Sequence, residues 1–120
     1  MAAILVVDDS TTMRQMVAFT LASAGHQVTE APDGNQALGL ARQKKFDLVI
    51  TDVNMPGMNG IDLVQSLRGL PECKFIPILV LTTEAGAELK QKGKSAGATG
   101  WIVKPFNPEL LLATLKKVLD

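Results

Sequence analysis

The sequence contains no tyrosine, one tryptophan, one histidine and one cysteine, and its charges cancel, with twelve Lys and Arg residues against twelve Asp and Glu residues. A single cysteine cannot form a disulfide within the chain, which favours a reducing compartment. Without a His or Cys cluster, the sequence offers no site for a soft metal ion. The balanced charge, with no long run of either sign, argues against binding to nucleic acid or to an anionic membrane.

Long apolar runs are also missing. None approaches the roughly 20 residues that cross a bilayer, and the opening stretch MAAILVVDD reaches two aspartates before a secretory signal could develop. We therefore expect a cytoplasmic protein without membrane insertion. Linker-like and low-complexity segments are absent too, so the expectation is one domain over residues 1–120, with no attached effector domain.

Four short apolar runs predict strands that are buried on both faces. They are largely non-alternating and mostly rich in β-branched residues, a pattern typical of parallel sheets. The runs cover residues 4–7, 48–50, 78–81 and 101–103. A weaker, alternating run at residues 28–31 predicts an edge strand.

Apolar residues between these runs recur at helical spacing. Between the first two runs, Met13, Met16, Val17 and Leu21 share one predicted buried face, and Gly25 is placed to end the helix. Three further helices are predicted from N-cap residues, which are Asp33, Asn59 and Asn107.

The remaining helix is predicted over residues 87–96 and differs from the others. Gly86 and Gly93 each lower helix propensity by about 1 kcal/mol relative to Ala wherever they are helical. We expect it to be the least stable helix. Five alternations of strand and helix give βαβ units, whose right-handed crossovers place helices on both faces of one parallel sheet. The predicted fold class is α/β, doubly wound.

Polar residues follow four of the predicted strands. Asp8 and Asp9 come after the first strand, Asp52 after the third, Thr82 after the fourth and Lys104 after the fifth. Parallel strands end at one edge, so we expect these side chains to meet there. Three carboxylates beside one ammonium leave about two excess negative charges, and each carboxylate pair about 4–5 Å apart repels by roughly 3–4 kcal/mol.

A hard divalent cation is expected to offset this repulsion. Mg²⁺ suits the donor set, because it is bound by a few carboxylates, several waters and phosphate. A carboxylate beside such an ion can attack a phosphoryl group and form an aspartyl phosphate. Lys104 would then neutralise charge on the phosphoryl oxygens, and the Thr82 hydroxyl would donate a hydrogen bond to one of them.

The sequence resembles the receiver domains of bacterial two-component response regulators. The segments that carry the resemblance are VVDDS at 6–10, TDVNMPGMNG at 51–60, VLTTEA at 80–85 and GATGWIVKPF at 97–106. The resemblance extends over essentially the whole chain and implies a flavodoxin-like fold with five parallel strands in the order 2-1-3-4-5. It also implies a signalling switch that is no enzyme beyond its own phosphorylation and dephosphorylation.

The resemblance assigns roles to individual residues. Asp52 is the expected phosphoacceptor. Asp8, Asp9 and Asp52 are expected to hold Mg²⁺ together with the backbone carbonyl of Asn54. Asn54 and Glu84 occupy two variable positions that tune hydrolysis of the phosphoryl group in the family.

Four more residues have roles implied by the resemblance. Lys104 is the expected cation beside the phosphoryl group, and the Lys104–Pro105 peptide bond is expected to be cis. Thr82 is expected to move toward the phosphoryl group. Trp101 stands where the family usually carries Tyr or Phe, so a coupled Thr82–Trp101 switch is a hypothesis for this chain.

The same resemblance implies partners. A histidine kinase is the expected phosphodonor, a flagellar motor switch protein is the leading expected target in chemotaxis, and a phosphatase is a further possible partner. Two other outputs stay open: a phosphate sink or phosphorelay intermediate, and a stand-alone regulator of a process other than chemotaxis.

Two other classes of protein share parts of this pattern. Phosphohydrolases of the haloacid-dehalogenase type also use a strand-end Asp, Mg²⁺, Thr and Lys, but their motif carries a second Asp where this sequence has Asn54. A flavodoxin-like FMN carrier would need a neutral or basic phosphate cradle after the first strand, where this sequence has the acidic turn DDSTTM. Both classes are disfavoured.

Overall fold

The computed structural model describes residues 1–119. Strands and helices alternate in the order β1 (Ala3–Val7), α1 (Thr11–Ser23), β2 (Gln27–Ala31), α2 (Gly34–Gln43), β3 (Leu48–Thr51), α3 (Gly60–Arg68), the 3₁₀ turn η1 (Pro71–Cys73), β4 (Ile78–Thr82), α4 (Ala87–Ala96), β5 (Gly100–Val103) and α5 (Pro108–Leu119). All strand pairs are parallel, in the order β2-β1-β3-β4-β5. The α/β, doubly wound, flavodoxin-like prediction is confirmed.

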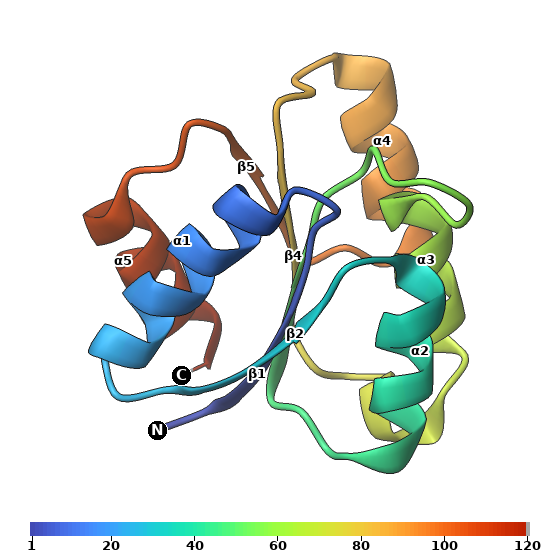
Figure 1. Ribbon diagram of the computed structural model, residues 1–120. Coiled ribbons are helices and arrows are strands. Elements are labelled where there is room, and N and C mark those ends of the chain that lie inside the picture. The colour runs from blue at the N-terminus through green and yellow to red at the C-terminus, as the bar shows by residue number, and fades with distance from the viewer. Residues whose placement is uncertain (120) are drawn as a thin grey trace.

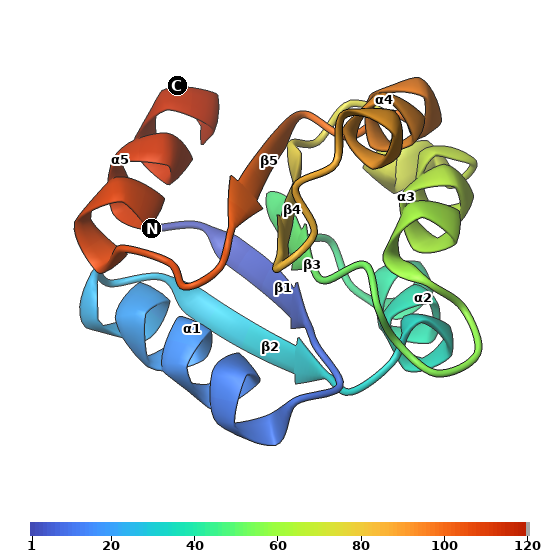
Figure 2. The same ribbon diagram turned by 90° about the horizontal axis from the view of Figure 1, so that it is seen from above.

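The helices cover both faces of the sheet. α1 and α5 lie on one side, and α2, α3 and α4 lie on the other (Figures 1 and 2). Successive residues of β1 serve opposite faces: Ile4 and Val6 belong to the core on the α1 and α5 side, whereas Leu5 and Val7 belong to the other core. This two-sided burial explains why the apolar runs of the central strands do not alternate.

Two predictions about burial are wrong. β5 is an edge strand, so Trp101 and Ile102 are only partly buried and Val103 is 40% exposed. In α1, Val17 and Leu21 are fully buried, but Met16 is 51% exposed. The sheet contacts a narrower stripe of this helix than its apolar content predicts.

The predicted helix starts are confirmed at three positions. Side-chain oxygens of Asp33 and Asn59 accept hydrogen bonds from backbone N–H groups in the first turns of α2 and α3, and Asn107 does the same for α5. α4 begins at Ala87, and its N-cap residue Gly86 offers no side-chain cap. Among residues 1–119, no helix combines the length and apolar character that a membrane span requires.

Candidate functional site

The carboxyl ends of four strands lie at the same edge of the sheet. Val7 at the end of β1 pairs with Thr51 at the end of β3, and Thr82 at the end of β4 pairs with Val103 at the end of β5. The residues that follow each strand therefore leave the sheet close together. This register is what gathers the predicted site residues.

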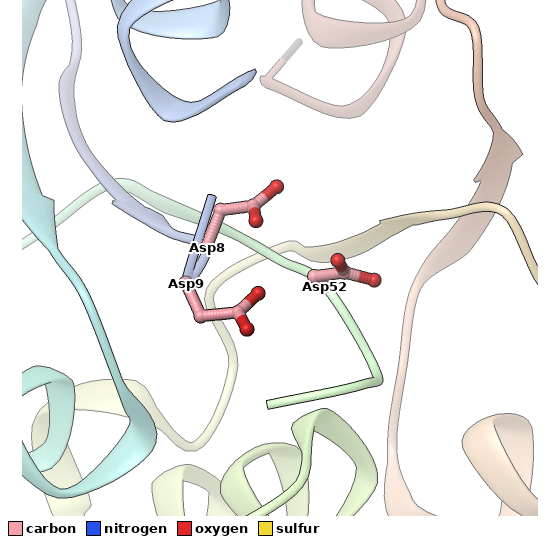
Figure 3. Close-up of side chains that lie close together, drawn as sticks. All are labelled: Asp8, Asp9 and Asp52. Atoms are coloured by element: carbon pink, nitrogen blue, oxygen red, sulfur yellow. The ribbon is translucent and has the colours of Figure 1, made fainter. Parts of the chain in front are cut away.

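Three carboxylates from this edge form a cluster. Asp8 and Asp9 follow β1, Asp52 follows β3, and each offers an oxygen within 4.8 Å of the others. Figure 3 shows the Asp8 and Asp9 side chains extending toward the side on which Asp52 lies. The structure thus brings together the carboxylates that strand order predicts.

Lys104 joins two of these carboxylates. Its Nζ donates hydrogen bonds to Asp8 Oδ2 at 2.8 Å and to Asp52 Oδ2 at 2.9 Å, and its side chain is only 8% exposed. Burial alone would lower the pKa of Lys104, but the hydrogen bonds and charges of Asp8 and Asp52 outweigh it and raise the pKa above its ordinary value. The ammonium is therefore a permanent positive charge at neutral pH.

The second oxygen of each buried carboxylate is held by the backbone. Asp8 Oδ1 accepts from the Ser10 N–H at 2.9 Å, and Asp52 Oδ1 accepts from the Val53 N–H at 2.6 Å. Asp9 is exposed. Its carboxylate accepts no hydrogen bond from residues 1–119, so it is free to take a ligand.

The donor set fits a hard cation. All three side chains offer carboxylate oxygens, and Lys104 compensates only one of their three charges. Oxygen ligands with a net negative charge are what Mg²⁺ prefers in proteins. The charges of Asp8, Asp52 and Lys104 sum to minus one, and the exposed Asp9 brings the total to minus two.

A chain of hydrogen bonds links the neighbouring loops. Thr82 is fully buried; its hydroxyl oxygen accepts from the Glu84 N–H at 3.3 Å, and its carbonyl accepts from the Lys104 N–H at 2.8 Å. The Glu84 carboxylate accepts from Asn54 Nδ2 at 2.9 Å, and the Glu84 carbonyl accepts from Trp101 Nε1 at 2.8 Å. Glu84 is thus the link between β3, β4 and β5 at this edge.

The Lys104–Pro105 peptide bond is cis, as the resemblance implies.

Comparison with known proteins identifies the family to which the chain belongs. The model for the response regulator receiver domain matches residues 4–116. The chain belongs to the response-regulator receiver family.

Relatives of this receiver domain carry chemotaxis names, although not all do. Chemotaxis protein CheY-3 of Vibrio cholerae is 47% identical over 118 residues, which are 98% of this chain and 88% of the relative. Protein PilH of Pseudomonas aeruginosa is 40% identical over 119 residues, 99% of this chain and 98% of the relative. These matches place the chain among receivers of the CheY type and lend no support to the phosphohydrolase alternative.

Solved structures give the same result. Chemotaxis protein CheY4 of Vibrio cholerae superimposes with a TM-score of 0.95 at 55% identity over 98% of both chains. The receiver domain of the sensor histidine kinase PA1611 of Pseudomonas aeruginosa superimposes with a TM-score of 0.91 at 26% identity, over 98% of this chain and 97% of the other. That receiver domain was crystallised with a magnesium ion coordinated in its active-site cleft.

Two residues that support the receiver site were missed in the sequence. Gly60 begins α3 so close to Asp52 that a Cβ atom would overlap the Asp52 carbonyl oxygen. Arg14 donates from Nη1 to the Asp8 carbonyl at 2.7 Å and from Nε to Glu30 at 3.0 Å. For Gly60, the available signal was its position directly after the N-cap residue Asn59. For Arg14, nothing in the local sequence indicates the contact with Asp8.

Proposed function

We propose that this receiver domain accepts a phosphoryl group on Asp52 from the phosphohistidine of a histidine kinase, with Mg²⁺ bound at the carboxylate cluster. The observation that carries the proposal is the buried Asp8–Lys104–Asp52 network with Asp9 beside it. Such a network combines a nucleophile, a fixed cation and spare carboxylate oxygens, which together suit phosphoryl transfer.

The chain's own residues account for the transfer step. A carboxylate oxygen of Asp52 attacks phosphorus, the P–N bond to the donor imidazole breaks, and its electron pair stays on the imidazole nitrogen. The Val53 N–H and the Lys104 ammonium fix the orientation of the carboxylate before the attack. The same ammonium then lies within reach of the phosphoryl oxygens and neutralises their charge.

Asp8, Asp9, Asp52 and the carbonyl of Asn54 are the residues that would hold Mg²⁺. When bound, the ion would offset the negative charge of the transferring group. Asp8 also pairs with Lys104, so this carboxylate would interact with both cations. The role of the Asn54 carbonyl stays a prediction.

The output is proposed to depend on the β4–α4 region. Thr82 stands at the end of β4, and its carbonyl is bonded to the backbone of Lys104, so a shift of either residue reaches the other. The uncapped start of α4 suits a surface that changes with phosphorylation, because mobile elements come from the less stable parts of a fold. The protein would act in the cytoplasm and catalyse only its own phosphorylation and dephosphorylation.

Chemotaxis is the favoured process, with a flagellar motor switch protein as target. The support is the chemotaxis names of relatives such as CheY-3 and CheY4 of Vibrio cholerae. Protein PilH carries no such name at similar identity, so a phosphate sink, a phosphorelay intermediate or a regulator of another process is the second candidate.

Intact mass after incubation with acetyl phosphate and Mg²⁺ tests the proposal. We expect one phosphoryl adduct in the wild type, none in Asp52→Asn, and none in excess chelator. Asp62→Asn is the matched control, because Asp62 is an exposed aspartate on α3 outside the cluster. An adduct that persists in Asp52→Asn would place the acceptor elsewhere.

A binding experiment separates the two candidate outputs. The wild type loaded with beryllofluoride and the Asp52→Asn variant are each passed over immobilised motor switch protein. Retention of the loaded wild type alone supports the chemotaxis output, and equal lack of retention favours the second candidate.

A further inference from the structure

The indole ring of Trp101 packs against α4 at Gly93, in space that a side chain at position 93 would fill; this position of the ring is its seat. Gly93 is buried, and a Cβ atom at this position would lie 2.6 Å from Trp101 Cζ3 and 3.2 Å from Cε3. Distances this short cannot be accommodated without displacing the ring. The absence of a side chain at position 93 is therefore what admits an indole where relatives are expected to carry a smaller ring.

The polar side of the indole is fixed as well. Trp101 Nε1 donates to the carbonyl oxygen of Glu84 at 2.8 Å, a good distance for an N–H to oxygen bond. The ring thus packs against α4 and is bonded to the β4–α4 loop. A side chain held at both ends has little freedom to change rotamer.

Glu84 carries this constraint toward the phosphoacceptor. Its carboxylate accepts from the side-chain amide of Asn54 at 2.9 Å, and Asn54 is two residues from Asp52. The bridge joins the loop after β3 to the loop after β4. The indole is therefore two hydrogen bonds away from the loop that carries Asp52.

We propose that Trp101 is a positioning residue of the phosphoacceptor site. Seated against Gly93, it holds the Glu84 carbonyl, keeps the Glu84–Asn54 bridge closed and so limits the access of water to the aspartyl phosphate. In the hydrolysis that this restrains, water attacks phosphorus, the P–O bond to Asp52 breaks with its electron pair returning to the carboxylate, and inorganic phosphate leaves. The inference rests on the proposed function.

This role differs from that of a swinging aromatic. The coupled Thr82–Trp101 movement requires the indole to change position with phosphorylation, whereas a positioning residue keeps its place in both states. Trp101 is the single tryptophan, so the tryptophan fluorescence of the protein reports directly on the surroundings of this ring. Acrylamide quenching that is equal with and without beryllofluoride is expected, and a change in quenching would overturn the fixed seat.

The variants Trp101→Phe, Gly93→Ala and their combination test the role. Gly39→Ala is the matched control, because Gly39 is a helical glycine with open space around its missing Cβ. In unphosphorylated protein, Gly93→Ala should raise acrylamide quenching and Gly39→Ala should leave it unchanged. With ³²P-labelled protein, Trp101→Phe and Gly93→Ala should each shorten the phosphoryl lifetime about threefold or more, the scale of losing one hydrogen bond.

The double variant supplies a compensation that general damage to the fold would not produce. A phenyl ring lacks the indole atoms that a Cβ at position 93 would meet, so the Gly93→Ala change should shorten the lifetime in the Trp background and not in the Phe background. Wild type that takes no label would overturn the proposed function and this inference with it. Labelled wild type with equal lifetimes in all variants would overturn the positioning role alone.

Discussion

The carbonyl oxygen of Asp52 lies where a side chain of Gly60 would begin. The Gly60 N–H also donates to the Val53 carbonyl at 2.8 Å, so the first turn of α3 closes directly onto the end of β3, next to Asp52. A methyl group at position 60 would have to push the helix away from the sheet edge. Gly60 is thus a requirement of the site geometry rather than of backbone torsion.

Gly60→Ala should lower the free energy of unfolding by about 1–3 kcal/mol or more, as overpacking against backbone does. It should also weaken Mg²⁺ binding, because the loop after Asp52 would shift. Urea denaturation and calorimetric Mg²⁺ titration measure the two effects. Gly39→Ala, in open space on α2, should raise stability by up to about 1 kcal/mol, and an equal loss in both variants would contradict the explanation.

Lys104→Met should lower the free energy of unfolding by about 3–5 kcal/mol in chelator, because it leaves two buried carboxylates without their cation. Added Mg²⁺ should recover part of this loss, since the ion would return positive charge to Asp8 and Asp52. Urea denaturation with and without MgCl₂ checks both statements. Lys45→Met, at an exposed position, should stay within about 0.5 kcal/mol of the wild type.

The contribution of Lys104 should also depend on pH in one direction. The pKa of Lys104 is raised from its ordinary value of 10.5 in the folded protein, so its stabilising effect is fully present below that ordinary value and is lost as pH rises through the folded-state value. The stability difference between wild type and Lys104→Met should therefore be constant from neutral pH to about 10 and shrink above it. A difference that already declines near neutral pH would contradict the pairing.

Arg68 should be a main support of the opposite end of the fold. Its guanidinium donates to the carbonyls of Gly97 at 2.8 Å, Ile76 at 2.6 Å and Cys73 at 2.8 Å, and burial lowers its pKa from the ordinary value. Arg68→Ala should cost about 2–3 kcal/mol of unfolding free energy.

Arg68→Lys should recover little of that loss, because an ammonium cannot span several carbonyls as a planar guanidinium does. Thermal or urea denaturation measures the series. Arg42→Ala is the control, since Arg42 is exposed on α2. Full recovery by lysine would show that charge alone, rather than the fork of donors, matters at position 68.

Arg14→Ala should destabilise the protein more than Glu30→Ala. The first variant removes a charged donor from the Asp8 carbonyl, worth about 1.5–3 kcal/mol, whereas the second removes only a partly exposed ion pair worth at most about 1 kcal/mol. Urea denaturation of both variants tests the order. Equal losses would mean that the Arg14–Glu30 pair, and not the Asp8 carbonyl, is the important contact.

The sequence was informative wherever local pattern determines structure. Apolar runs located the strands, the caps Asp33, Asn59 and Asn107 located helix starts, and the parallel arrangement brought the polar strand ends to one edge. The same reasoning failed for Met16 and β5, because how much of an element is covered depends on its neighbours in space.

The supporting residues of the site were beyond such reasoning. Gly60 and Arg14 contact residues that are near in the chain, Asp52 and Asp8, whereas Glu84 reaches Asn54 and Trp101 across larger separations. In each case the contact depends on the path of the loop between the two residues. Glu84 was singled out through resemblance alone, and nothing in the sequence indicates its three hydrogen bonds.

The contact between Lys104 and Asp8 spans 96 positions of the chain, and that between Lys104 and Asp52 spans 52. A polypeptide still emerging from the ribosome can therefore contain Asp8, Asp9 and Asp52 and yet lack their cation until the residue after the fifth strand is made. Because both contacts need residue 104, the carboxylate–ammonium network can be completed only after most of the chain has been made. Under the proposed function, competence to accept a phosphoryl group would coincide with completion of the molecule, and a truncated chain that ends before Lys104 is expected to accept none.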